Sequence, residues 1–338
     1  MTAAWVIFLF SIPLWMDDLY VLHILISTGI FTIAAISLNL LLGYTGQLSL
    51  GHVAFFGIGA YTSALISLGF DLEISDSYTF VFAPQPVWIA FVAGIVVAGL
   101  FGWLIGKIAF KVRGAYFVIV TISFAEVVRL VSLNWIDLTE GPMALNNIRP
   151  FSIDIPGVWD LTFYQKMPNY YLVLITAIVC YIIVRRLVHS RAGRAMIGLR
   201  ENEALASSVG VDVTHYLILA TIISAAMAGA AGGLYTHYIR IVDPDIFLFI
   251  YTVTMVIMVV TGGKGTTAGP IVGGLIFGML PEILREFASP EAQWMIYGVF
   301  MIVVVFFLPQ GIVPAVTSWW KARAAAPTNS LGTAEQSR

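Results

Sequence analysis

Charged side chains are rare inside the apolar stretches of this sequence, and two of them are spaced so that they can interact. Glu126 and Arg129 stand three residues apart in the run T-I-S-F-A-E-V-V-R-L, so a helix would carry both on one face. A lone charge within a membrane costs at least a few kcal/mol, so such residues pair or face water. The spacing predicts either a structural pair that locks this helix to its neighbours or, with Thr121 and Ser123, a polar patch on a path for a solute.

A second set of polar side chains lies where glycines interrupt an apolar run. Gln47, Ser49 and His52 stand in the middle of residues 41–65, and Asn39 precedes them. Within lipid, a broken helix is tolerated only against protein or a water-filled cavity. We therefore expect this run to turn or break in a protein-lined space, where its polar side chains either bond to neighbouring helices or line a transport path. The glycines of this break, which serve either close helix packing or that path, are Gly43, Gly46, Gly51, Gly57 and Gly59.

The sequence has no motif for catalysis, metal binding or nucleotide binding. The run G-G-K-G-T around Lys264 is not a phosphate-binding loop, because that motif needs glycine where Met258 stands and Ser or Thr where Gly265 stands. H-E-x-x-H and G-x-S-x-G do not occur, and the single cysteine, Cys180, cannot form an intrachain disulfide. We expect no catalytic residue, no metal site and no cofactor in this chain, and a membrane-embedded enzyme has no supporting motif.

The composition indicates that helices crossing a membrane position these residues. Of the 338 residues, 59% are hydrophobic and 11% are charged, whereas soluble domains carry about a quarter charged residues. The apolar runs have the length of helices and lack the strand alternation of a membrane β-barrel. We predict an all-α, polytopic membrane protein with about ten spans, of which the first is short. The ten apolar segments are 3–16, 19–42, 48–70, 87–106, 115–134, 169–184, 215–236, 246–261, 268–284 and 293–308.

Lysine and arginine determine the expected orientation. If ten spans alternate, four basic residues, Arg149, Lys166, Arg240 and Arg285, fall on one side, and twelve fall on the other. The positive-inside rule makes the side with twelve cytoplasmic, so we expect both termini there. The twelve are Lys107, Lys111, Arg113, Arg185, Arg186, Arg191, Arg194, Arg200, Lys264, Lys321, Arg323 and Arg338.

We predict one transmembrane domain, residues 1–320, followed by a tail at 321–338. The tail is rich in Ala, Thr, Ser and Asn without an apolar face, so we expect it to be disordered and cytoplasmic. The outer loop, 135–168, is rich in turn residues. The inner loop, 185–214, holds good helix formers between Ala195 and Val209 followed by a glycine. It predicts a short amphipathic helix that lies on the membrane surface or forms a docking surface for another protein.

Four runs of the sequence resemble, in order, the signatures of one transporter family. They are L-N-L-L-L-G-Y-T-G-Q-L-S-L-G-H-V-A-F-F-G-I-G-A-Y, T-I-S-F-A-E-V-V-R-L, G-L-R-E-N-E-A-L-A-S-S-V-G and G-G-K-G-T-T-A-G-P-I-V-G, and they span about residues 38–284. The family is that of the permeases of bacterial branched-chain amino acid ABC importers. The chain most resembles the LivM-like member of the usual permease pair.

The resemblance implies a transport subunit of the bacterial inner membrane that has no enzymatic activity of its own and no nucleic-acid partner. Its implied partners are a LivH-like sister permease, two cytoplasmic ATPases that bind ATP, a periplasmic substrate-binding protein and membrane lipid. The inner-loop helix would be the coupling helix that meets the ATPase, although its glycine lies seven residues after the Glu of Glu-Ala, where the general importer pattern has six. The implied coupling residues are Arg200, Glu201, Asn202, Glu203, Ala204 and Gly210.

The outer loop and the substrate are less well determined by the resemblance. The run L-T-E-G-P-M-A-L-N-N-I-R-P resembles a family stretch that is richer in glycine, from which Ala144 and Asn147 depart. The implied substrates are branched-chain or related amino acids, and a zwitterion would suit Glu126 and Arg129. Urea, amides and aromatic or organic acids are alternatives in the same family. An ion-coupled secondary transporter fits the broken helix equally well, but it usually needs ionisable relays, and Glu126 is the only carboxylate well inside an apolar segment.

Overall fold

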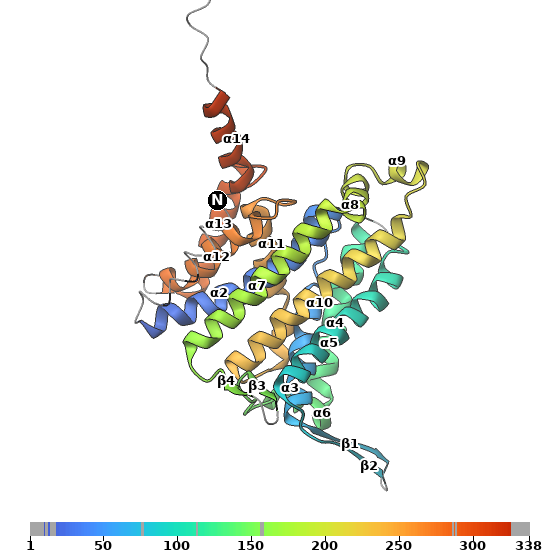
Figure 1. Ribbon diagram of the computed structural model, residues 1–338. Coiled ribbons are helices and arrows are strands. Elements are labelled where there is room, and N and C mark those ends of the chain that lie inside the picture. The colour runs from blue at the N-terminus through green and yellow to red at the C-terminus, as the bar shows by residue number, and fades with distance from the viewer. Residues whose placement is uncertain are drawn as a thin grey trace, which may run out of the picture.

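The structure is a computed structural model, and it describes residues 10, 13, 18–75, 78–112, 114–155, 159–285, 287 and 289–325. Within these residues the chain is almost entirely helical, with two short hairpins (Figure 1). The helices are α2 (Leu19–Asn39), the π-helix η1 (Leu40–Thr45), α3 (Val53–Leu68), α4 (Val87–Ala109), α5 (Ala115–Asn134), α6 (Ile136–Thr139), the 3-10 helix η2 (Gly141–Met143), α7 (Lys166–His189), α8 (Arg191–Glu201), α9 (Glu203–Ser208), α10 (Val213–Ile239), the 3-10 helix η3 (Pro244–Phe247), α11 (Phe249–Gly262), α12 (Gly269–Arg285), α13 (Pro290–Phe307) and α14 (Ile312–Ala325). The strands are β1 (Phe70–Ser75), β2 (Tyr78–Phe82), β3 (Ser152–Ile155) and β4 (Trp159–Thr162).

Nine of the ten apolar segments expected from the sequence form helices, which confirms the all-helical class. The remaining segment, 3–16, lies almost wholly outside the described residues. In the described part of the chain, five helices are long and apolar enough to cross a membrane: α2 with η1, α4, α5, α7 and α10. The helices α3 and α11 and the first part of α12 are apolar but shorter, so the count of about ten spans stays a prediction.

The core forms around α10, which packs against α2, α3 and α4. Its sequence A-A-M-A-G-A-A-G-G lets neighbouring helices approach to backbone contact, as small residues do in membrane bundles. A Cβ atom on Gly229 would lie 2.5 Å from the Cβ of Ala98, and one on Gly232 would lie 1.9 Å from the carbonyl oxygen of Phe56. The close approach of α3, α4 and α10 places residues 53–59, which belong to the run 41–65 that is predicted to turn or break, against the core.

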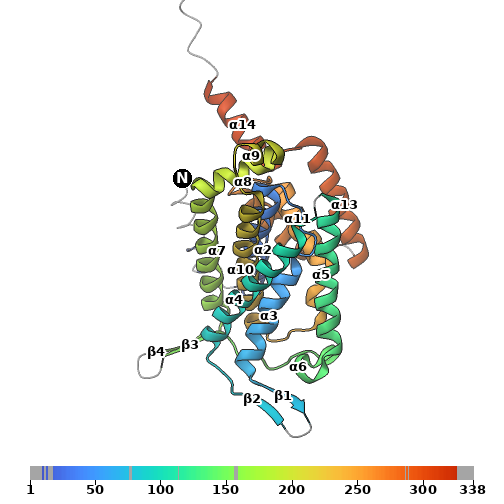
Figure 2. The same ribbon diagram turned by 90° about the vertical axis from the view of Figure 1, so that its right-hand side faces the viewer.

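The two ends of the bundle differ (Figures 1 and 2). One end carries the hairpins β1–β2 and β3–β4, both antiparallel, and the other carries α8, α9 and α14. The β1–β2 hairpin was not expected from the sequence, and its register pairs Phe70 with Phe82, whose rings stack at 5.2 Å.

The first residues of the tail that we expect to be disordered, 321–338, are helical in the structure. Residues 321–325 are the last residues of α14, and 326–338 lie outside the described residues. Helix continues because Lys321, Ala322 and Arg323 are good helix formers, and the guanidinium of Arg323 lies over the ring of Trp319 at 3.9 Å. A cation above an aromatic face one turn earlier stabilises this end of the helix.

Candidate functional site

The expected break lies directly after α2, where the helix first changes type and then gives way to an irregular segment. The α-helix ends at Asn39, the π-helix η1 continues to Thr45, and Gly46 ends it in the left-handed region with φ 75°. Residues 46–52 are not helical, and α3 begins at Val53. The π-helices of proteins occur frequently at functional sites, so this segment is the first place to look for one.

An arginine from a distant helix contacts the break. Arg200, in the last turn of α8, donates a hydrogen bond from Nη1 to the carbonyl oxygen of Gly43 at 2.8 Å. The same guanidinium donates from Nη2 and Nε to Oε1 of Glu201 at 2.5 and 3.1 Å. The aliphatic part of Arg200 packs on Gly46, where a Cβ atom would lie 3.0 Å from its Cγ. One side chain therefore bridges α8 and η1.

Asn39 joins the same break to the glycine-rich loop between α11 and α12. Its Oδ1 accepts a hydrogen bond from the backbone N–H of Gly265, and its Nδ2 donates one to the carbonyl oxygen of Thr266, both at 2.9 Å. The side chain is buried, and both ends of its amide are used. We call Asn39, Gly43, Arg200, Gly265 and Thr266 the α2 junction.

The backbones in the α2 junction are in direct contact. A Cβ atom on Gly43 would lie 2.1 Å from Oδ1 of Asn39 and 2.4 Å from the nitrogen of Gly265. A Cβ atom on Gly265, which has φ 73°, would lie 2.6 Å from Nη1 of Arg200. Side chains are therefore excluded from the two positions where η1, α8 and the α11–α12 loop meet.

His52 is fully buried at the start of α3, and its partner lies on α2. Its Nε2 is 2.7 Å from Oγ of Ser37, whose hydroxyl proton is donated to the carbonyl oxygen of Ala34 at 2.6 Å. Since that hydroxyl has only one proton, Nε2 of His52 is the donor to Ser37. Ser224 on α10 donates to the carbonyl oxygen of Ser37 at 2.5 Å. His52 is thus part of a polar link among three helices, and its Nδ1 has no partner among the described residues.

The remaining predicted path residues near the break are divided between interior and surface. Ser49 and Thr121 are buried, Gln47 is half-buried and Ser123 is exposed. Thr121 donates its hydroxyl to the carbonyl oxygen of Val118 within α5 at 2.8 Å. These four side chains therefore do not share one exposure, and a path lined by them stays a prediction.

The predicted glycines of the break pack closely against other parts of the chain. Gly51 lies against the backbone of Thr121, Gly57 against the ring of Phe247, and Gly59 against the backbone of Gly229. Each contact would place a Cβ atom under 3.0 Å from its neighbour. Close approach at small residues is typical of packing in membrane bundles, and a role of these glycines in a transport path stays a prediction.

Glu126 and Arg129 form the expected ion pair on an outward face of α5. Nη2 of Arg129 lies 2.9 Å from Oε1 of Glu126, and Nε lies 3.1 Å from both carboxylate oxygens. The side chains are 51% exposed for Glu126 and 22% for Arg129. Their apolar neighbours Ile122 and Val127 are exposed as well. The pair does not point into the helical core, so it does not lock α5 to the rest of this chain.

The segment expected as one amphipathic helix consists of two. α8 ends at Glu201 and α9 begins at Glu203, because Asn202 between them is extended, with φ −158° and ψ 104°. Its side chain accepts a hydrogen bond from the N–H of Leu205 at 2.9 Å and so caps α9. Gly210, with φ 88°, ends the segment where the sequence predicts a helix stop.

The apolar residues of this segment divide into an inner and an outer set. Met196, Leu199 and Ala206 are buried, whereas Leu205 and Val209 of the α9 region are 63% and 74% exposed. Glu201, Asn202 and Ala204 are also exposed. The tip of the segment therefore presents these two apolar side chains among polar ones.

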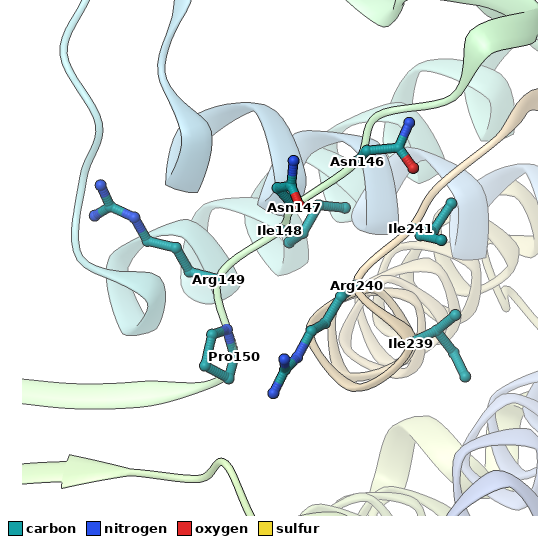
Figure 3. A pocket seen from close by; sticks show the side chains of 8 residues that line it. All are labelled: Asn146, Asn147, Ile148, Arg149, Pro150, Ile239, Arg240 and Ile241. Atoms are coloured by element: carbon teal, nitrogen blue, oxygen red, sulfur yellow. The ribbon is translucent and has the colours of Figure 1, made fainter.

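At the opposite end of the bundle, the outer loop forms a shallow pocket with the end of α10 (Figure 3). Its volume is about 410 Å³. Leu145 and Val242, which neighbour the lining residues in sequence, exchange two backbone hydrogen bonds at 2.8 and 3.1 Å and so join the outer loop to the end of α10. The lining residues are Asn146, Asn147, Ile148, Arg149, Pro150, Ile239, Arg240 and Ile241.

Four non-glycine residues of the described chain have positive φ, and two of them, Asn147 and Arg240, line this pocket. The other two are Glu140 and Ala144. Ala144, with φ 62° and ψ 146°, lies in a region that is nearly restricted to glycine. Ala144 and Asn147 are also the positions where the chain departs from a glycine-richer family stretch, so the backbone explains the glycines that the resemblance leads one to expect.

The partners of the candidate residues are not among the residues that the sequence marks. Ser37 and Ser224 stand in no motif that marks them, and Gly265 and Thr266 belong to a run that resembles a family signature but predicts no contact with Asn39. The one available signal was the glycine density of that run, which is typical of a close backbone approach. Among the residues that the structure describes, no cluster of three His, Cys, Asp or Glu side chains could hold a metal ion.

Comparison with known proteins identifies the family. The sequence model described as "Branched-chain amino acid transport system / permease component" matches residues 20–305. No solved structure matches the chain.

Curated relatives agree with this family. The high-affinity branched-chain amino acid transport system permease protein LivM of Salmonella typhimurium is 30% identical over 306 residues, which cover 85% of this chain and 68% of the relative. LivM of Escherichia coli is 30% identical, with 88% of this chain and 71% of the relative covered. The permease protein LivH of Escherichia coli is 27% identical, with 84% of this chain and 91% of the relative covered. The chain therefore belongs to the family of permease components of branched-chain amino acid transport systems.

Proposed function

We propose that this chain is a permease subunit of an ABC importer, and that it moves branched-chain or related amino acids across the bacterial inner membrane. The family match over residues 20–305 carries the proposal. In this proposal the chain itself has no enzymatic activity and binds no cofactor. Two partner ATPases at the cytoplasmic face bind and hydrolyse ATP. A periplasmic binding protein delivers the substrate at the outer face.

The part of the α8–α9 segment from Arg200 to Gly210 is the proposed contact for an ATPase. It exposes Leu205 and Val209 beside polar residues, and Arg200 bonds it to the helix break. A partner that moved this segment would therefore act on residues deep in the bundle. The positive-inside rule supports a cytoplasmic position for this end, since α7 ends and α8 begins among arginines.

The outward face of α5 is the proposed contact with the sister permease and one wall of the translocation path. Glu126 is half exposed in the middle of an apolar helix of membrane-spanning length, and a charge in that position is not left facing lipid. A second permease subunit, LivH-like by the same family resemblance, covers this face in our proposal. The outward face of α4, with Val92, Val96 and Leu100, is exposed and apolar and suits lipid.

The descriptions of the relatives and the charge pair on α5 support an amino-acid substrate. A zwitterion has an ammonium group for Glu126 and a carboxylate for Arg129. Urea, amides and aromatic or organic acids are the alternatives within the family. An ion-coupled secondary transporter is the alternative outside it, and Glu126 would be its coupling carboxylate.

Reconstitution tests the proposal. The chain is placed in liposomes with its sister permease, both ATPases and the binding protein, and uptake of labelled leucine is followed with ATP or with a non-hydrolysable analogue inside. We expect uptake that requires hydrolysable ATP and the binding protein. Uptake by this chain alone, driven by a proton or sodium gradient, would favour the secondary transporter. A panel of leucine, phenylalanine and urea then assigns the substrate class.

A further inference from the structure

We propose that Arg200 is a positioning residue that transmits movement of α9 to the helix break, and that Asn39 passes the same movement to the loop before α12. The inference rests on the proposed function, because it assumes that an ATPase displaces α9. It assigns to Arg200 a role inside this chain that differs from contact with the partner.

Arg200 lies where movement of α9 would reach α8. It stands at the end of α8, two residues before Asn202, where the extended backbone separates α8 from α9. The buried residues Met196 and Leu199 hold α8 on the bundle, while α9 projects with Leu205 exposed. A force on α9 is therefore applied to the end of α8 that carries Arg200.

The carbonyl group that Arg200 binds belongs to a helix end. The last carbonyl groups of a helix have no partner within it and carry partial negative charge. Arg200 supplies both a donor and a positive charge to Gly43 near the end of η1. The bond is charge-assisted, which makes it stronger than a neutral hydrogen bond. Movement of Arg200 thus acts on the π-helix and on the irregular segment that follows it.

The α2 junction has little free space to absorb such movement. Gly43 and Gly265 are in backbone contact, and Gly265 also lies against the guanidinium of Arg200. Asn39 holds this loop by two hydrogen bonds of 2.9 Å, across 226 residues of sequence. The helix break after α2, the end of α8 and the loop before α12 therefore meet at one tightly packed point, so displacement of one of them acts on the other two.

The contacts of Arg200 determine what each substitution at position 200 removes. Lysine at position 200 keeps the charge and one donor for Gly43, but it lacks the planar fork that also holds Glu201. Glutamine removes the charge. Arg194, in the same helix, is exposed, and its one side-chain hydrogen bond among the described residues goes to the carbonyl oxygen of His189 at the end of α7, at 3.2 Å. It is a matched control for the loss of one arginine from α8.

The test uses the complete transporter with Arg200→Gln, Arg200→Lys or Arg194→Gln, and measures the number of solute molecules taken up per ATP hydrolysed. We expect Arg200→Gln to keep co-purification of the ATPases and to lower this ratio by about 5-fold to 150-fold, the usual range of coupling between sites. Arg200→Lys recovers part of the loss, and Arg194→Gln behaves as the unaltered transporter. If Arg200→Gln gives no folded complex, Arg200→Lys tests the inference instead. Its number of solute molecules taken up per ATP hydrolysed must then lie below that of Arg194→Gln.

Two results would overturn the inference. An unchanged ratio in both Arg200 variants shows that the bond to Gly43 transmits nothing. Loss of ATPase co-purification in Arg200→Gln, with the ratio unchanged in whatever complex remains, makes Arg200 a docking residue. Failure of the proposed function is distinct from both, because it appears as a lack of ATP-dependent uptake in the unaltered transporter.

Discussion

Gly59 on α3 and Gly229 on α10 face each other with their backbones in contact. A Cβ atom added to Gly59 would lie 2.4 Å from both the Cα atom and the carbonyl oxygen of Gly229. Because the obstructing atoms belong to a helix backbone, no side-chain rotation can relieve the overlap. The contact determines how close α3 and α10 can pack, and so where the helix break lies relative to the core.

We expect Gly59→Ala to destabilise the chain by about 1–3 kcal/mol, the usual cost of overpacking a core. Gly298→Ala in α13 is the control, because a Cβ atom there meets nothing within 4 Å and alanine favours a helix. Thermal unfolding of the purified full-length chain in detergent measures both. A Gly59→Ala midpoint equal to that of Gly298→Ala would show that α3 and α10 are not held at this distance.

Strain in the outer loop leads to a stabilising substitution. Ala144 has φ 62°, and an L-residue on the left-handed side costs about 1–2 kcal/mol relative to an unstrained conformation. We expect Ala144→Gly to raise the unfolding midpoint, with a gain of about 1 kcal/mol after glycine's larger entropy loss is included. Ala195→Gly, in the regular helix α8, should instead lower it by a similar amount. A destabilising Ala144→Gly would mean that the methyl group contributes more than the strain costs.

The sequence predicts the helices well because each is determined by local pattern. Segment 115–134 coincides with α5, and Glu126 and Arg129 pair as their spacing predicts, since both depend on residues within a few turns. The break after Asn39 is also expected, because glycines weaken a helix wherever it packs. The helical class thus follows from composition and periodicity alone.

The parts that the sequence does not predict depend on tertiary contacts or on single capping residues. The bond between Asn39 and Gly265 joins residues 226 positions apart, and no local signal marks it. The helix predicted at 195–209 is divided at Asn202, whose side chain caps α9, a role that asparagine prefers over a place inside a helix. The outward direction of Glu126 depends on how α5 packs, which helical spacing alone does not determine.

The buried link between His52 and Ser37 should contribute to stability. Ser37→Ala removes the acceptor of the His52 Nε2–H and leaves a buried donor unpaired, which costs about 1–3 kcal/mol. Ser67→Ala is the matched control, because Ser67 is also buried and donates to the carbonyl oxygen three residues earlier, with no histidine partner. Its effect should be near zero, since such back-bonding stabilises a helix little.

A double variant separates this link from the general effect of losing a hydroxyl group. In Ser37→Ala with His52→Leu both polar partners are gone, and an apolar replacement of a whole pair is often nearly neutral. We expect the double variant to be more stable than Ser37→Ala alone, by the same thermal unfolding measurement. If it is less stable by the full sum of the two single effects, the two residues act independently.

The charge pair on α5 distinguishes a structural role from a transport role. Glu126→Leu or Arg129→Leu alone leaves one unpaired charge on an apolar helix, which costs a few kcal/mol in the membrane. We expect both single variants to give low yields of assembled transporter. The double variant Glu126→Leu with Arg129→Leu should assemble normally because no charge remains, and it should lose uptake because the polar wall of the path is gone. Tyr116→Leu, on the same helix and 70% exposed, is the control that changes an exposed side chain without changing charge. If the assembled double variant takes up solute at the rate of Tyr116→Leu, the pair has only a structural role and the path is not lined by this face of α5.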